Sequence, residues 1–403
     1  MPDYGKFTAR GGDEVEQFLT ELLHNMGEAF RDILPDASYR SVVLIGGYGR
    51  GEGGVQIAGS RECPHNNLDL MVITTPAFTP DLRDRLDKSV AQFAEDAELG
   101  IDISYIEETR LRRSPCLVMW YDMRFGHKTV LGDDQFLRGL DRFTEDRIEP
   151  LDVLRLMINR GTLLVINDVF LEKEDVLASH RKLIVKHVMK ALIGFGDAYL
   201  FSRGQYDWSY LEKQNRMQAL ADAPEDLKRL YEEALEFRFS PDYDNYADKN
   251  LHEWAEELRA LLAPLFLQFE RDRLQKPTMD WPTYLQSALS REFKNGFTSP
   301  RGLAKLAVYG IRTRGTNDVG GLGTWLASRC VGDRVMMPLV YPAVYFNIED
   351  PGFRKAAQAY LQAPGDDRHA LRHGFLRKWG EIGDSNFQSV IHANGIQLDG
   401  PAN

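Results

Sequence analysis

The sequence predicts an α/β N-terminal domain with a small mixed sheet, followed by an α-helical bundle and a mixed, mostly helical C-terminal region. Helical and strand patterns alternate over about the first 110 residues, and from about residue 150 the apolar residues take helical spacing. The chain has 403 residues, more than one hydrophobic core usually serves, so we expect two or three domains. We place them at residues 1–148, 149–274 and 275–403.

The N-terminal domain is expected to contain two helices and three strands. Residues 13–34 carry apolar side chains three and four apart, which indicates an amphipathic helix. A second helix follows Thr79, a suitable N-cap before Pro80 at the first helical position, and Gly100 is a suitable stop. We expect strands at residues 41–46, 68–74 and 101–106.

The remainder of the chain is expected to be helical. The bundle extends to about residue 273, and residues 275–284 indicate a boundary because they contain two prolines and lack periodicity. The apolar run 335–346 is too short to span a bilayer and is expected to be a buried segment. Residues 310–323 are rich in glycine and basic residues and are expected to form a loop.

Composition and charge describe a soluble, reduced protein. The net charge of −11 argues against a general nucleic-acid or anionic-membrane binder, while leaving room for a local basic pocket. Cys63, Cys116 and Cys330 fit no metal-binding or CxxC spacing, and the N-terminus lacks the apolar core of a signal peptide. We therefore expect a cytoplasmic protein without a membrane segment. The sequence leaves open whether the protein forms a homo-oligomer.

A glycine-rich segment follows the first expected strand. Residues 46–54 hold six glycines, which is costly because glycine loses the most backbone freedom on folding. Exposed N–H groups in such a loop can bind phosphate oxygens, and Arg50 within it could neutralise a triphosphate. The alternative is a tight structural turn.

Two aspartates lie in the next two expected strands. Asp69 stands between two leucines, where a carboxylate needs a partner, and Asp102 has a similar setting. Because adjacent strands lie about 5 Å apart, carboxylates that share a face can hold one divalent cation. The alternative for each residue is an ordinary carboxylate near the end of a strand.

This order of features resembles the nucleotidyltransferase superfamily that contains DNA polymerase beta. The matching segments are LIGGYGRGE (44–52), NLD (67–69) and Asp102 in GIDISYI. The GGYGRGE spelling is similar to the uridylyl-transferring enzyme of bacterial nitrogen regulation and, more loosely, to aminoglycoside nucleotidyltransferases. The resemblance covers residues 40–106, about a quarter of the chain.

The resemblance implies transfer of a nucleoside monophosphate from a nucleoside triphosphate to a hydroxyl group, with release of pyrophosphate. It implies Mg²⁺ or Mn²⁺ held by Asp69 and Asp102, with Asn67 as a third catalytic position, and a small-molecule or protein acceptor. A following helical bundle that closes the cleft and supplies a lysine to a phosphate is common in this superfamily. The nucleotide-binding residues it implies are Gly46, Gly47, Tyr48, Arg50, Gly51, Lys186 and Lys190.

The sequence departs from the family pattern at Asn67, where the family has an aspartate. Asn67 and Asp69 share one face of a strand, and an amide oxygen can ligate a cation without contributing charge. One alternative is therefore an enzyme with one metal or weak metal binding, and another is a degenerate regulatory protein that binds nucleotide without transferring it. A third is that Asn67 is an introduced change, and Glu52 is a candidate compensating carboxylate.

Two Arg-x(4–6)-His patterns, Arg181 to His187 and Arg368 to His373, resemble the ribonuclease motif of helical HEPN proteins. Their recurrence in one chain shows how easily the pattern arises by chance. The basic run 368–379 is expected to pair with acidic neighbours or to face solvent.

Overall fold

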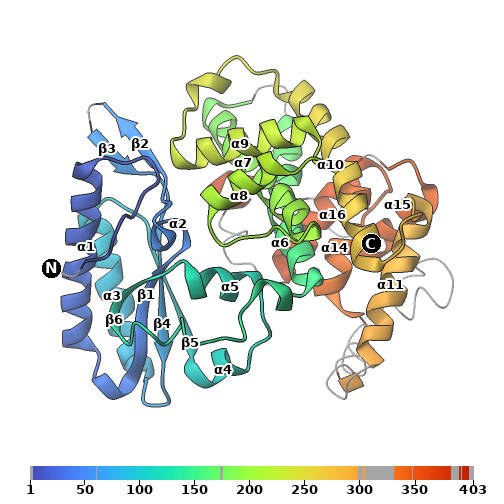
Figure 1. Ribbon diagram of the computed structural model, residues 1–403. Coiled ribbons are helices and arrows are strands. Elements are labelled where there is room, and N and C mark those ends of the chain that lie inside the picture. Colours follow the sequence, from blue (N-terminus) through green and yellow to red (C-terminus); the bar gives the residue numbers. More distant parts are fainter. Residues whose placement is uncertain are drawn as a thin grey trace. The chain divides into compact units, whose positions relative to one another are not determined.

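The computed structural model describes residues 3–59, 61–172, 176–297, 303–304, 331–346, 348–382, 390–391 and 393–398 (Figure 1). The chain divides into two compact units, each made of two segments. Unit 1 comprises Met1–Val153 and Arg203–Asn245, and unit 2 comprises Leu154–Ser202 and Tyr246–Asn403. This division differs from the three consecutive domains that the sequence predicts, because residues 203–245 return to the N-terminal unit.

Unit 1 is built on a mixed sheet with the strand order β5-β4-β1-β6. Strand β1 pairs antiparallel with β4 and β6, while β4 and β5 run parallel. Together with the surrounding helices, this confirms the expected mixed α/β class and the three expected strands. The strands are β1 (Tyr39–Ile45), β4 (Leu68–Thr74), β5 (Ile101–Glu107) and β6 (Lys128–Gly132).

Helices α1 (Asp13–Ile33) and α3 (Pro80–Asp96) cover one face of this sheet (Figure 1). Alternate strand residues such as Val42, Leu70 and Val72 join their apolar stripes in one core, as the two-residue period of a strand requires. The intervening residues, which include both aspartates, therefore point to the opposite face.

The Thr79 cap is confirmed, since its hydroxyl accepts a hydrogen bond from the N–H of Leu82 at 3.3 Å. The predicted stop at Gly100 is wrong. The helix ends at Asp96, and Glu98 takes the left-handed conformation with φ +48°, so a non-glycine residue makes the reversal before β5.

Shorter elements complete unit 1. They are α2 (Gly46–Arg50), β2 (Val55–Ala58), β3 (Arg61–Pro64), α4 (Glu108–Arg113), α5 (Val118–Phe125), α8 (Tyr210–Ala219) and α9 (Glu225–Phe239). Single 3₁₀ turns lie at Asp36–Ser38, Glu145–Arg147 and Asp244–Tyr246.

Unit 2 is helical where it is described, as expected. Its elements are α6 (Pro150–Leu171), α7 (Ala178–Ser202), α10 (Leu251–Leu274), α11 (Trp281–Phe297), α14 (Asp333–Tyr345), α15 (Pro351–Leu361) and α16 (Arg368–Glu381). The apolar run predicted at 335–346 is the buried helix α14, which contains Pro338 and Pro342. Among the described residues, no helix combines the length and apolarity needed to cross a membrane.

Two other expectations concern unit 2. Residues 275–284 connect α10 and α11 and continue into the first turn of α11, so this segment joins helices of one unit. Residues 310–323 lie outside the described residues.

Candidate functional site

Asp69 and Asp102 face each other across neighbouring strands. They are direct partners in the parallel register of β4 and β5, and Ile45, the last residue of β1, pairs with Asp69 on its other side. Strand neighbours lie about 4.8 Å apart, so the two carboxylates leave the same face of the sheet close together. The structure thus brings together the two predicted metal ligands at the junction of three strands.

Asn67 joins this pair as a hydrogen-bond donor. Its Nδ2 donates to Oδ2 of Asp102 at 3.0 Å, and an ionised carboxylate can only accept, which fixes the orientation of the amide. Oδ1 of Asn67 lies over Gly100, where an added Cβ would come within 2.4 Å of it. In this orientation the N–H of the Asn67 amide faces the Asp102 carboxylate. The Asn67 oxygen is not the atom beside that carboxylate.

Gly46 brings the backbone directly against Asp69. Its φ is +69°, a conformation that side chains other than glycine rarely adopt. A Cβ at position 46 would meet Oδ2 of Asp69 at 2.5 Å. Glycine at this position therefore permits both the turn out of β1 and the close approach to a carboxylate.

The glycine segment is a short helix where a loop was expected. Residues Gly46–Arg50 form α2, which ends at Gly51 with φ +78°. Tyr48 belongs to the core, because its ring is buried and its hydroxyl donates to the carbonyl of Gly54 at 2.7 Å. Burial raises the pKa of Tyr48 to about 12. A Cβ at Gly53 would meet the ring of Tyr48 at 2.1 Å and one at Gly49 would meet the carbonyl oxygen of Leu44 at 2.5 Å, so these two glycines serve the packing of this segment.

The side chain of Arg50 is 9% exposed and is ion-paired within unit 1. Its Nη2 lies 2.5 Å from Oδ2 of Asp122, and Oδ1 of the same carboxylate accepts a hydrogen bond from the hydroxyl of Tyr206 at 3.0 Å. Burial alone would lower the pKa of Arg50, but Asp122, Tyr210 and Tyr206 together outweigh burial and raise this pKa. Arg50 therefore has a structural partner, and its predicted contact with a triphosphate stays a prediction.

Glu52 caps helix α8. Its carboxylate accepts from the hydroxyl of Ser209 at 2.5 Å and from the N–H groups of Tyr210 at 2.7 Å and Leu211 at 3.4 Å. The side chain is buried, and these donors would otherwise lack partners at a helix start. The candidate compensating carboxylate thus joins α8 to the glycine segment.

Two basic residues that the sequence does not indicate, Arg238 and Lys213, lie against the ring of Tyr210. The guanidinium of Arg238 lies 4.5 Å from the ring centroid of Tyr210, and Nζ of Lys213 lies 4.2 Å from the same centroid. A Cβ added to Gly47 would come within 3.0 Å of Nη2 of Arg238. Nε of Arg238 is buried and makes no hydrogen bond with the described residues. This arginine thus lies beside Gly47.

No local signal in the sequence could have found these two residues. Arg238 lies on α9 and Lys213 on α8, far along the chain from Gly47. Each sits in an ordinary helical pattern with charges on both sides, and only the return of residues 203–245 to unit 1 brings them to the glycine segment.

Lys186 and Lys190 lie on α7, in unit 2. Both are partly buried, and burial lowers the pKa of Lys186. They belong to a different unit from the two aspartates, so their contact with a phosphate stays a prediction.

The donor set at the sheet fits a divalent cation that prefers oxygen. Asp69 and Asp102 supply two carboxylates, and Asp102 is exposed, so a bound ion could keep water and phosphate oxygens as further ligands. The chain matches no protein-family model, no curated protein and no solved structure, so these residues and their geometry carry the functional argument.

Proposed function

We propose that unit 1 binds a nucleoside triphosphate together with Mg²⁺ or Mn²⁺ and transfers its nucleoside monophosphate to a hydroxyl group of a small molecule or protein. The observation that carries this proposal is the direct pairing of Asp69 and Asp102 beside the backbone of Gly46. The proximity of Arg238 to Gly47 supports it, because a phosphate chain needs cations next to the carboxylate-bound metal.

Each residue has a chemical role in this proposal. Asp69 and Asp102 would hold the cation, which when bound supplies charge neutralisation at the phosphates. Arg238 would bind a phosphate oxygen near Gly47. Asp102, exposed at the sheet, would accept the proton of the acceptor hydroxyl. The hydroxyl oxygen would then form its bond to the α-phosphorus as the bond to pyrophosphate breaks and pyrophosphate departs. Positioning and charge neutralisation account for most of the acceleration in such reactions.

A second candidate function is nucleotide binding without transfer. The hydrogen bond from Asn67 to Asp102 favours it, because an amide beside a carboxylate is a stable pair without any cation. A family-type aspartate at position 67 would instead repel Asp102 unless a cation lay between them.

Calorimetric titration with ATP, GTP, CTP and UTP, each with and without Mg²⁺, tests the proposal. One nucleotide should bind in a Mg²⁺-dependent way, and Asp69→Asn should abolish the Mg²⁺ dependence, since Asp69 is a proposed ligand. Asp84→Asn, at an exposed position of α3, is the matched control and should bind as the unchanged chain does. Absence of binding for all four nucleotides, or equal binding by both variants, would rule out the proposed site.

A further inference from the structure

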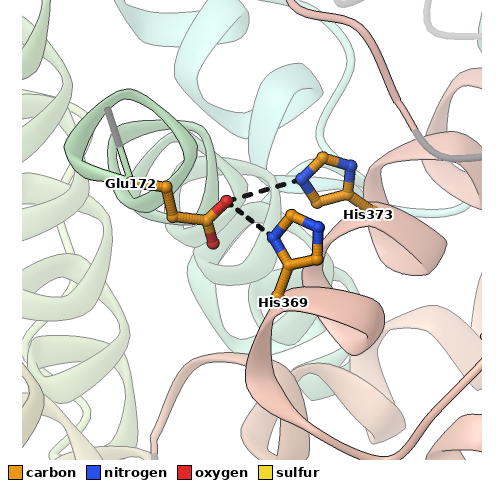
Figure 2. Close-up of side chains that lie close together, drawn as sticks. All are labelled: Glu172, His369 and His373. Carbon is orange, nitrogen blue, oxygen red and sulfur yellow. Dashed lines mark hydrogen bonds and ion pairs between the residues drawn. The ribbon is translucent and has the colours of Figure 1, made fainter. Parts of the chain in front are cut away.

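A second cluster of metal-ligating side chains lies in unit 2, apart from the aspartate site. Glu172, at the end of α6, meets His369 and His373 of α16 (Figure 2). The two histidines are four residues apart, so they share one face of the helix, and their ring centroids are 4.1 Å apart. Figure 2 shows both rings directed at the same carboxylate oxygen of Glu172.

The distances in this cluster are close to those of a metal site. Nδ1 of His369 lies 2.8 Å from Oε2 of Glu172, and Nε2 of His373 lies 3.5 Å from the same oxygen. One ligand atom from each residue lies within 4.8 Å of the others. Ligands of tetrahedral zinc at about 2.0–2.1 Å are separated by about 3.4 Å, so small side-chain rotations would suffice.

The surroundings orient the carboxylate toward the histidines. Nη1 of Arg372 lies 3.1 Å from Oε1 of Glu172, the oxygen that the histidines do not use. Arg372 is held in turn by Asp168, at 3.0 Å between Nη2 and Oδ2. Such support of a ligating carboxylate by neighbouring polar groups is typical of metal sites.

The local charge also permits a cation. Asp168, Glu172 and Glu256 are linked by ion pairs to Arg259 and Arg372, so three carboxylates meet two guanidinium groups. With neutral imidazoles, this network carries one net negative charge. The environment that a divalent ion would enter is therefore not net positive. The positive charge of Arg372 beside Glu172 lowers the ion affinity that the three ligands alone would provide.

We propose that Glu172, His369 and His373 bind a divalent transition-metal ion of the zinc class. Two imidazoles and one carboxylate suit zinc, cobalt or nickel and do not suit Mg²⁺, which takes oxygen ligands. The side chain of His373 is 6% exposed and that of His369 is 54% exposed, so one ligand anchors the site within the unit and another opens it to solvent. Three protein ligands leave a coordination position for water or a small anion.

The test is titration of the chelator-treated 403-residue chain with Co²⁺ in excess Mg²⁺, which keeps the oxygen-rich site of unit 1 filled. We expect one Co²⁺ per chain, with visible absorption that added Zn²⁺ removes. His369→Gln changes an exposed ligand, and it should weaken Co²⁺ binding about tenfold or more. Glu172→Gln should weaken it as well.

His252→Gln is the matched control, because His252 is an exposed histidine of the same unit, on α10, outside the cluster. It should leave Co²⁺ binding unchanged, and circular dichroism should show all variants folded. Binding that is equal in His369→Gln and His252→Gln would overturn the proposal, as would the absence of stoichiometric binding. The three side chains would then be a plain histidine–carboxylate pairing.

Discussion

The Asp69 carboxylate lies against the α-carbon of Gly46, so the residue at position 46 decides where that carboxylate can lie. The same holds one strand away, where Asn67 lies over Gly100 and donates to Asp102. At the scale of single residues, the site therefore depends on two glycines as much as on its polar side chains.

Gly46→Ala should therefore lose metal-dependent nucleotide binding. Gly204→Ala is a matched control, because Gly204 has φ +64° against +69° at Gly46 and nothing lies within 4 Å of its added Cβ. Left-handed backbone costs both alanines about 1–2 kcal/mol of unfolding free energy, measurable by urea denaturation. Only the alanine at position 46 also displaces Asp69. Equal Mg²⁺–nucleotide affinity in the two variants, by calorimetry, would contradict this assignment.

Arg238→Gln should weaken triphosphate binding about tenfold or more, since a charge-assisted hydrogen bond to phosphate contributes about 1.5–3 kcal/mol. Nη2 of Arg238 lies beside Gly47, and glutamine cannot supply its charge there. Arg229→Gln on the same helix is the control, because the ion pairs that Arg229 makes with Asp226 and Glu233 lie on the surface. If both variants bind nucleotide with equal affinity, the role of Arg238 is to pack against the ring of Tyr210.

At the scale of elements, α7 carries a buried histidine that couples stability to pH. Nδ2 of Asn167 donates to the carbonyl of Ile184 at 3.1 Å, so Oδ1 of Asn167 faces His187 and accepts from its Nδ1 at 2.8 Å. The imidazole therefore carries a proton on Nδ1. Burial, with Lys190 and Lys186 contributing, lowers the pKa of His187 to about 3 from its ordinary 6.5.

This shift predicts the sign of a pH effect. Below pH 6.5 the unfolded chain takes up a proton at His187 and the folded chain does not, so stability falls as pH falls from 6.5 toward 3. The loss from this group is at most about 1.4 kcal/mol per pH unit. His187→Asn keeps an N–H donor but cannot titrate, so its unfolding free energy should fall less steeply between pH 7 and 5.5. Identical slopes for the two chains in urea denaturation would contradict this.

At the scale of the whole molecule, local signals in the sequence predict the α/β core well. The Thr79–Pro80 cap, the apolar strands and the order of Asp69 and Asp102 each depend on residues close in the chain. The sequence leaves open whether the two aspartates share a face, because alternation within a strand does not fix the register between strands; the pairing of β4 with β5 decides it.

The unit boundaries could not be predicted, because they depend on contacts between distant residues. Glu52 accepts from Ser209 across 157 positions, and nothing around either residue indicates the other. The same long-range return explains why Arg238 was not predicted. Arg50 likewise has a distant partner, Asp122, 72 positions further along the chain, which the glycine pattern does not reveal. Similarly, Glu172 lies 197 positions from His369.

If Asp69, Asp102 and position 67 form a cation-dependent nucleotide site, the Asn67→Asp variant should strengthen it. The new carboxylate would lie beside Asp102, so without a cation it should lower the unfolding free energy, and Mg²⁺ should restore it. Mg²⁺-dependent nucleotide affinity, measured by calorimetry, should rise on the order of tenfold, or about 1.4 kcal/mol. Unchanged or weaker Mg²⁺-dependent binding in Asn67→Asp would show that these three positions do not form a cation-dependent nucleotide site.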